Sequence, residues 1–191
     1  AKGLTIVCDI NYRKNLWGYG MQPHDVIYNM MQYSDIVFGD QNEWEVASGV
    51  KHIPFNALDA GYVINREAYQ EYFRKMHVLF PKCKKMVMAL RNQLASSHHT
   101  LTGLLYDAVH DCLYTTKIYD IQPIVDPMGV GDAFVAGYIH AHQKWAADNQ
   151  YCLDFALSAS ALKNTIPGDQ NLVTEEEIIS NLTSSGGRIQ R

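Results

Sequence analysis

The sequence predicts an α/β fold, a mainly parallel β-sheet flanked by helices. Short apolar segments typical of buried strands alternate with longer segments whose apolar residues recur at helical spacing. Residues 86–91 (Met-Val-Met-Ala-Leu-Arg) have the nearly continuous apolar pattern of a buried strand. Of the 191 residues, 47% are hydrophobic and 19% are charged, as in globular proteins. We therefore expect a single α/β domain over residues 1–191.

Each expected element has a local reason. Strands are expected where apolar and β-branched residues form short runs that end at glycine or polar clusters. These runs are 4–10, 35–38, 86–91, 101–106, 112–115 and 118–121, and we expect the last three to be antiparallel. Helices are expected over 25–33, 42–48, 66–79, 131–145, 152–163 and 175–182. Pro23 suits a first helical turn, Pro81 ends the helix 66–79, and a tail begins at residues 186–188.

Residues 4–10 (Leu-Thr-Ile-Val-Cys-Asp-Ile) predict a buried strand almost at the start of the numbering. A buried parallel strand normally has a neighbour on each side. We therefore expect an N-terminal portion to precede this numbering. The alternative is an edge strand whose leader residues have been trimmed.

Charge and composition argue against several classes of function. Sixteen Lys and Arg against twenty Asp and Glu leave a net charge of −4, whereas a nucleic-acid-binding protein normally has a basic face. No apolar run approaches the ~18 residues of a membrane helix. The four cysteines are scattered, without a CxxC motif or metal-site spacing, as expected for reduced thiols. We expect a cytoplasmic protein that binds neither nucleic acid nor membranes.

A glycine-rich turn leads directly into the helix expected from residue 131. Its residues are Gly129, Val130, Gly131 and Asp132. Glycines let backbone amides converge, and the first helical turn has unpaired N–H groups at the positive end of the helix dipole. The turn therefore predicts an anion site suited to a phosphate.

Asp132 is the unusual residue of this turn. A carboxylate at a helix start is a good cap, which gives it a purely structural interpretation. Beside a bound phosphate, however, a carboxylate repels the anion unless it has a chemical role. That role would be to accept the proton of an attacking hydroxyl in phosphoryl transfer.

Residues 126–137 (Asp-Pro-Met-Gly-Val-Gly-Asp-Ala-Phe-Val-Ala-Gly) resemble the C-terminal signature of the ribokinase-like (PfkB) sugar kinases. That signature reads Asp-Thr-x-Gly-Ala-Gly-Asp-x-Phe. Pro127 replaces its Thr and Val130 its middle Ala, and Val130 needs only its backbone amide for the role. The resemblance implies a ribokinase-like fold, ATP as phosphate donor and Asp132 as catalytic base. It also implies an anion hole made by the amides of Gly129, Val130, Gly131 and Asp132.

Other segments resemble the 2-keto-3-deoxygluconate kinases within that family. They are 9–17 (Asp-Ile-Asn-Tyr-Arg-Lys-Asn-Leu-Trp), 89–91 with 95–97, 162–171 and 187–191. The resemblance covers residues 4–191 and corresponds to the C-terminal part of full-length relatives. It implies that the preceding strands, several sugar contacts and a small β lid are not in this sequence.

Asn11 and Arg13 are candidate substrate ligands. They lie two residues apart beyond an expected strand end, so both side chains can point into one crevice. The guanidinium of Arg13 suits the carboxylate of a sugar acid or a phosphate. A surface ion pair is the alternative for Arg13, and the resemblance favours the ligand role.

The resemblance extends to further site residues. Asn42 and Glu45 match an Asn-x-x-Glu element that resembles a site organising Mg²⁺ and phosphate through water, although the helix dipole alone also favours acidic residues there. Arg91 and Ser97 resemble a loop on the nucleotide side. Asp169 lies in a Pro-Gly-Asp turn, where it serves either the turn itself or a sugar contact. A monovalent cation is a further candidate cofactor.

The resulting hypothesis is ATP-dependent phosphorylation of 2-keto-3-deoxygluconate. One alternative is another ribokinase-like sugar kinase, of the fructokinase or ribokinase type. A second is a truncated, non-catalytic nucleotide-binding fragment. A dinucleotide-binding oxidoreductase is disfavoured because no GxGxxG motif follows the first expected strand. The sequence is compatible with a homo-oligomer but does not determine the oligomeric state.

Overall fold

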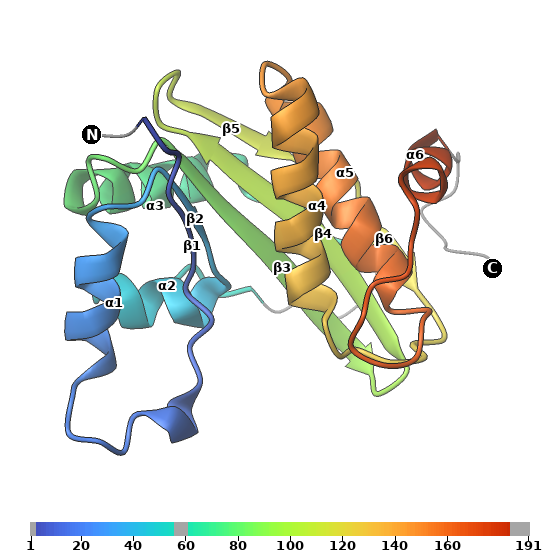
Figure 1. The fold of residues 1–191 in the computed structure, drawn as a ribbon, viewed down its shortest axis with the longest axis horizontal. Helices are drawn as coiled ribbons and strands as arrows, with labels where there is room; N and C mark the ends of the chain where they lie inside the picture. Colours follow the sequence, from blue (N-terminus) through green and yellow to red (C-terminus); the bar gives the residue numbers. More distant parts are fainter. Residues whose placement is uncertain (1–2, 56–60, 184–191) are drawn as a thin grey trace. The chain divides into compact units, whose positions relative to one another are not determined.

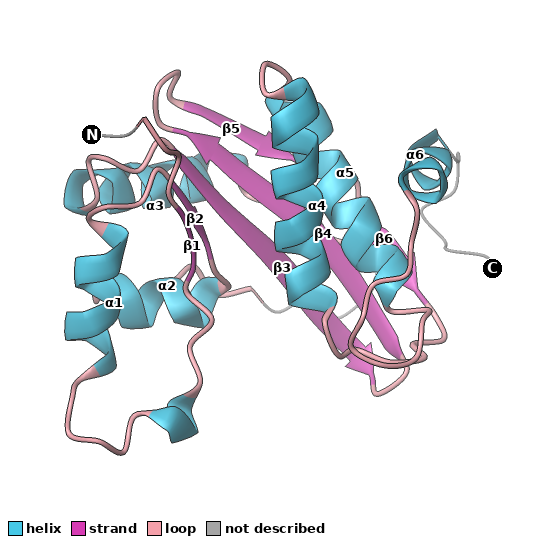
Figure 2. Cartoon of the chain, viewed as in Figure 1, coloured by secondary structure: helices cyan, strands magenta, loops and turns pink. Residues whose placement is uncertain are grey.

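The computed structural model describes residues 3–55 and 61–183. In this part of the chain, strands and helices alternate around a mixed six-stranded sheet with the order β1-β2-β3-β4-β5, and β6 pairs with β4 (Figures 1 and 2). The strands are β1 Val7–Asp9, β2 Ile36–Phe38, β3 Lys85–Ala95, β4 His98–Asp107, β5 Cys112–Thr115 and β6 Tyr119–Ile121. The predicted α/β class, a sheet flanked by helices, is confirmed.

The six described α-helices lie close to their predicted positions. They are α1 Pro23–Met31, α2 Gln41–Ser48, α3 Arg66–Leu79, α4 Val130–Trp145, α5 Asn149–Lys163 and α6 Glu175–Thr183, and a short 3-10 helix spans Lys14–Leu16. Pro23 opens α1, as its fixed φ predicts. None of these helices is both long and apolar enough to cross a membrane. The expected tail at 186–188 lies outside the described residues.

The chain divides into two compact units, residues 1–55, 64–88 and 105–113, and residues 56–63, 89–104 and 114–191. In the first unit β1, β2 and the start of β3 are parallel, with Val37 opposite both Cys8 and Met86. Its core is aromatic. The ring of Phe73 in α3 packs edge-on against the buried Trp44 of α2 and stacks on Tyr106 of β4.

The buried strand predicted over residues 4–10 is shorter and less buried than expected. The strand itself is Val7–Asp9, and its described pairing is with β2 alone. Cys8 and Ile10 reach the core, whereas Leu4 is 75% exposed and Ile6 44% exposed. The prediction of burial over the whole run is therefore wrong, because only one edge and one face of this strand are covered in the described chain.

In the second unit, helix α5 packs on a β-hairpin. A two-residue turn, Ser96 and Ser97, joins the end of β3 to β4, and β6 pairs antiparallel with β4. Helix α5 lies against β4, where a methyl group on Gly103 would come within 3.1 Å of the Leu153 side chain.

Small residues let α4 and α5 lie side by side in this unit (Figure 1). A methyl group on Gly137 of α4 would lie 3.0 Å from the Cβ of Ala159 and 3.1 Å from the Cα of Ala156. Because the backbones approach so closely, nearly all of α5 is buried, including its polar Ser158 and Ser160.

We predict that Gly137→Val lowers the free energy of unfolding by roughly 1–3 kcal/mol, because the larger side chain must push α4 and α5 apart. The matched control is Ala136→Val, one residue earlier on the exposed side of α4, which should cost about 0.5 kcal/mol through helix propensity alone. Urea denaturation followed by circular dichroism measures both. Equal losses in the two variants would contradict the packing argument.

Candidate active site

The turn before α4 leaves backbone amides without partners. Gly129 is the N-cap of α4, with φ 72° and ψ 4°, and no side chain caps the helix. The first bond of the helix runs from the N–H of Ala133 to the carbonyl of Gly129, 2.8 Å away. The N–H groups of Val130, Gly131 and Asp132 therefore have no acceptor within the helix. Together with the positive end of the helix dipole, they can bind an anion.

Asp132 is the third residue of α4, and its side chain is exposed. Its carboxylate has no hydrogen-bond or ion-pair partner among the described residues. The structural interpretation of Asp132 as the cap therefore does not apply, because the cap position belongs to Gly129. A carboxylate without such a partner beside an anion site can accept a proton.

Asp126 joins the turn before α4 to the turn after α5. Its Oδ1 accepts the N–H of Met128 at 2.9 Å, and its Oδ2 accepts the N–H of Gly168 at 2.8 Å. These two donors, and to a lesser extent the nearby charge of Lys163, hold the pKa of Asp126 below its usual value. The ionised carboxylate therefore connects the two turns through one hydrogen bond to each.

The second turn places Asp169 directly against Gly129. A Cβ on Gly129 would lie 2.2 Å from the backbone oxygen of Asp169 and 2.8 Å from its Oδ1. This close approach, together with the positive φ, requires glycine at position 129. The predicted residue Asp169 thus lies beside the anion-binding turn, with its side chain exposed.

Residues at the end of α5 form hydrogen bonds with the backbone of the same loop. The sequence did not single out these contacts. The hydroxyl of Ser160 donates to the carbonyl of Val130 at 3.0 Å. The carbonyl of Asn164 accepts the N–H of Val125 at 2.8 Å. The available signal was the presence of polar residues, among them Lys163, in the otherwise apolar helix 152–163.

Of the two predicted nucleotide-side residues, Ser97 lies near this loop and Arg91 lies within a strand. The carbonyl of Ser97 accepts the N–H of Ile124 at 2.9 Å, two residues before Asp126. The expected strand end at Arg91 is wrong, because β3 continues to Ala95 as part of the hairpin, and Arg91 therefore lies within the strand and not in a loop that follows it. Its side chain remains exposed on the strand.

In the first unit, Asn11 and Arg13 follow β1. Asn11 adopts a positive φ of 43°, which an asparagine tolerates better than most residues. Arg13 has the surface ion pair considered as its alternative role, with its Nη1 3.8 Å from Oε1 of Glu43. Its side chain is nevertheless 63% exposed, so the guanidinium can still bind a ligand.

Glu43 organises this segment and was not singled out from the sequence. Its Oε1 accepts the N–H of Tyr12 at 2.9 Å. Its Oε2 accepts the N–H of Asp40, whose carboxylate caps α2 in return. Burial raises the pKa of Glu43. The available signal was the capping-box spacing of Asp40 and Glu43.

Asn42 and Glu45 lie on the first turns of α2. The Oε2 atom of Glu45 accepts the backbone N–H of His52 at 3.2 Å and lies 2.6 Å from its Nδ1, and these contacts lower the pKa of Glu45. The described residues contain no group of three His, Cys, Asp or Glu side chains that could hold a metal ion. The remaining oxygen of Glu45 and the exposed amide of Asn42 are oxygen groups of the kind that Mg²⁺ prefers.

The chain resembles solved structures of carbohydrate kinases. No family model and no curated protein sequence matches the chain. Among solved structures, 2-dehydro-3-deoxygluconokinase from Thermotoga maritima is 27% identical with a TM-score of 0.80, and the match covers 96% of this chain and 51% of that one. The solved structures similar to this chain are those of PfkB-family carbohydrate kinases. The resemblance stated from the sequence is confirmed.

Two further solved structures have the same fold. A PfkB family carbohydrate kinase from Listeria grayi is 24% identical with a TM-score of 0.77, and the match covers 95% of this chain and 51% of that one. Fructokinase with bound ATP from Xylella fastidiosa is 17% identical with a TM-score of 0.64, and the match covers 92% and 51% of the two chains. The chain therefore spans about half the length of the PfkB kinases it matches.

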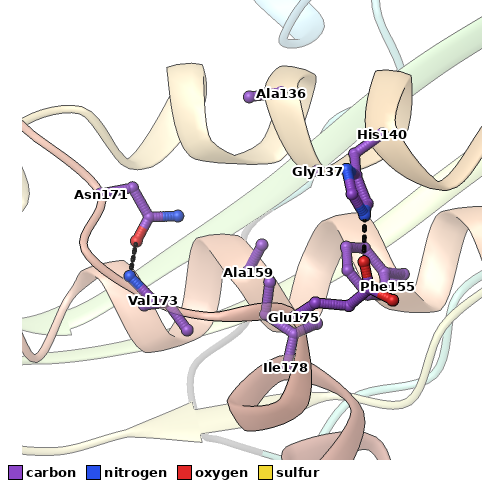
Figure 3. A pocket seen from close by; sticks show the side chains of 9 residues that line it. All are labelled: Ala136, Gly137, His140, Phe155, Ala159, Asn171, Val173, Glu175 and Ile178. Atoms are coloured by element: carbon purple, nitrogen blue, oxygen red, sulfur yellow. Dashed lines mark hydrogen bonds and ion pairs between the residues drawn. The ribbon is translucent and has the colours of Figure 1, made fainter.

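A small cavity of about 170 Å³ lies elsewhere in the second unit, between α4, α5 and the segment that leads into α6 (Figure 3). Glu175 closes one side, with its Oε2 2.6 Å from Nε2 of His140 and hydrogen-bonded to Lys144. His140 and Lys144 of α4 both contact this one carboxylate, so we infer that the cluster holds the start of α6 on α4.

We predict that Gly129→Ala lowers the free energy of unfolding by about 1–3 kcal/mol, because its methyl group would collide with Asp169 at a positive φ. Gly131→Ala is the matched control, since a methyl group there meets no atom within 4 Å. Thermal unfolding of the two variants measures the difference. A stable Gly129→Ala protein would contradict the close approach.

Proposed function

We propose that this chain carries the catalytic base and the anion hole of a kinase that transfers the γ-phosphate of ATP to a hydroxyl of 2-keto-3-deoxygluconate. The observation that carries the proposal is the unpartnered carboxylate of Asp132 beside the free amides at the start of α4. The likeness to 2-dehydro-3-deoxygluconokinase, at 27% identity over 96% of the chain, supports the choice of substrate.

In the proposed step, Asp132 accepts the proton of the substrate hydroxyl. The hydroxyl oxygen forms a bond to the γ-phosphorus while the bond from that phosphorus to the bridging oxygen of ATP breaks, and ADP leaves. The amides of Gly129, Val130, Gly131 and Asp132 donate hydrogen bonds to the charge on the transferred group. Asp126 keeps these amides in position through its bonds to Met128 and Gly168.

The other predicted residues take supporting roles. We assign the carboxylate of the sugar acid to Arg13, and sugar hydroxyls to Asn11 and Asp169, since guanidinium, amide and carboxylate groups suit these partners. Arg91 and Ser97 are assigned to the nucleotide side.

Magnesium would be held mainly by ATP phosphates and water, with Asn42 and Glu45 contacting it through water. When bound, the ion supplies charge neutralisation of the phosphates.

A non-catalytic nucleotide-binding fragment is the second candidate. The observation that favours it is the anion-binding turn at the start of α4, which can hold a nucleotide phosphate without transferring it. The two candidates differ in a direct way, since both bind an ATP analogue and only the kinase transfers phosphate.

We predict that Asp132→Asn lowers kcat by about 10²–10⁴-fold, because the amide cannot accept the hydroxyl proton. Affinity for a non-hydrolysable ATP analogue should be unchanged or tighter, since a negative charge beside the phosphate is removed. Glu176→Gln, an exposed acid in the first turn of α6, is the control and should keep full activity. Coupled ADP-release kinetics and calorimetry measure these effects. Full activity of Asp132→Asn would contradict the mechanism, and analogue binding without transfer by the unsubstituted chain would favour the fragment.

We predict that Arg13→Met raises KM for 2-keto-3-deoxygluconate about tenfold or more, because a charge-assisted bond to the carboxylate is lost. The KM for fructose, which has no carboxylate, should stay constant. Lys14→Met removes an adjacent exposed charge and serves as the control. Equal turnover of fructose and the keto acid by the unsubstituted enzyme would contradict the assignment.

A further inference from the structure

Lys163, at the end of α5, is a fully buried lysine with a relative exposure of 0%. Its Nζ donates to the carbonyl of Ile166 at 3.1 Å, and it forms no close ion pair within the described chain. Burying an ammonium group is costly unless nearby dipoles and charges compensate it. The position of Lys163 therefore requires a physical reason.

That reason lies in the two turns that build the anion site. The ammonium group binds the carbonyl of Ile166 in the second turn. Asp126, in the first turn, binds the N–H of Gly168 two residues further on. The charge of Lys163 also contributes to the lowered pKa of Asp126. The ammonium group and the Asp126 carboxylate thus both bond to backbone groups of the second turn.

Ser160 of α5 and Asn164, the residue that follows the helix, hold other parts of the first turn. Ser160 donates to the carbonyl of Val130, and the carbonyl of Asn164 accepts the N–H groups of Val125 and Asp126 at 2.8 and 3.3 Å. These contacts are made by neutral groups. Lys163 is the basic residue of this network, bonded to the carbonyl of Ile166, and its charge makes a smaller contribution to the lowered pKa of Asp126 than the two backbone donors do.

We propose that Lys163 is a positioning residue that acts as a built-in monovalent cation, holding the turns at 126–129 and 166–169 so that the amides of α4 converge on the transferred phosphate. This inference rests on the proposed function of the anion site.

The test compares Lys163→Met, which keeps an unbranched side chain one atom shorter and removes its charge, with Lys144→Met, which removes an exposed charge from α4. Binding of a non-hydrolysable ATP analogue is measured by calorimetry in choline chloride and in ammonium chloride at equal ionic strength. The unsubstituted chain and Lys144→Met should bind equally in both salts. Lys163→Met should bind about tenfold more weakly in choline and recover in ammonium. Equal binding by Lys163→Met in choline, or weakened binding that ammonium does not restore, would overturn the proposal.

Hydrogen exchange at the amides of Met128 and Gly168 provides a readout that needs no ligand. We expect exchange about tenfold faster in Lys163→Met in choline, with protection restored by ammonium, and no change in Lys144→Met. Unchanged protection in Lys163→Met would overturn the positioning role. If the unsubstituted chain binds no ATP analogue but the exchange results hold, the proposed function fails and the role of Lys163 in the turns stands.

Discussion

The two hydrogen bonds of the Asp126 carboxylate are the interaction on which the candidate site depends. Asp126 and Gly168 are 42 residues apart in the sequence, yet the bond between them brings the turn before α4 against the turn after α5. The same carboxylate closes its own turn through Met128. With both turns held, Gly129 can adopt its left-handed conformation against Asp169, and the amides that follow it are free for a phosphate.

Close packing of two helices makes this connection geometrically possible. Gly137 allows α4 to approach Ala156 and Ala159 of α5 at distances that larger residues would forbid. The end of α5 then lies beside the loop that enters α4. There the Ser160 hydroxyl donates to the carbonyl of Val130, and the Asn164 carbonyl accepts backbone N–H groups of the loop. Buried polar side chains that would destabilise an ordinary apolar helix are thus satisfied, and they specify one conformation of the site.

In the first unit, the cap of helix α2 also positions a candidate ligand-binding segment. Asp40 and Glu43 form a reciprocal capping box at the start of α2, and Glu43 also binds the N–H of Tyr12 in the segment after β1. One carboxylate therefore orders both the helix start and the segment that carries Arg13. The cost is partial burial of a charge, which raises the pKa of Glu43.

The sequence by itself determined the elements whose causes are local. Helix α3 was predicted at Arg66–Leu79, where it is observed, because its amphipathic pattern is followed by Pro81. The glycine-rich turn that opens α4 was visible for the same reason, since glycine positions and helix starts depend on neighbouring residues. Only the tertiary structure decided how much of residues 4–10 is buried, where β3 ends and what Asp126 and Lys163 contact. Those properties depend on which distant segments come together, and no local pattern carries that information.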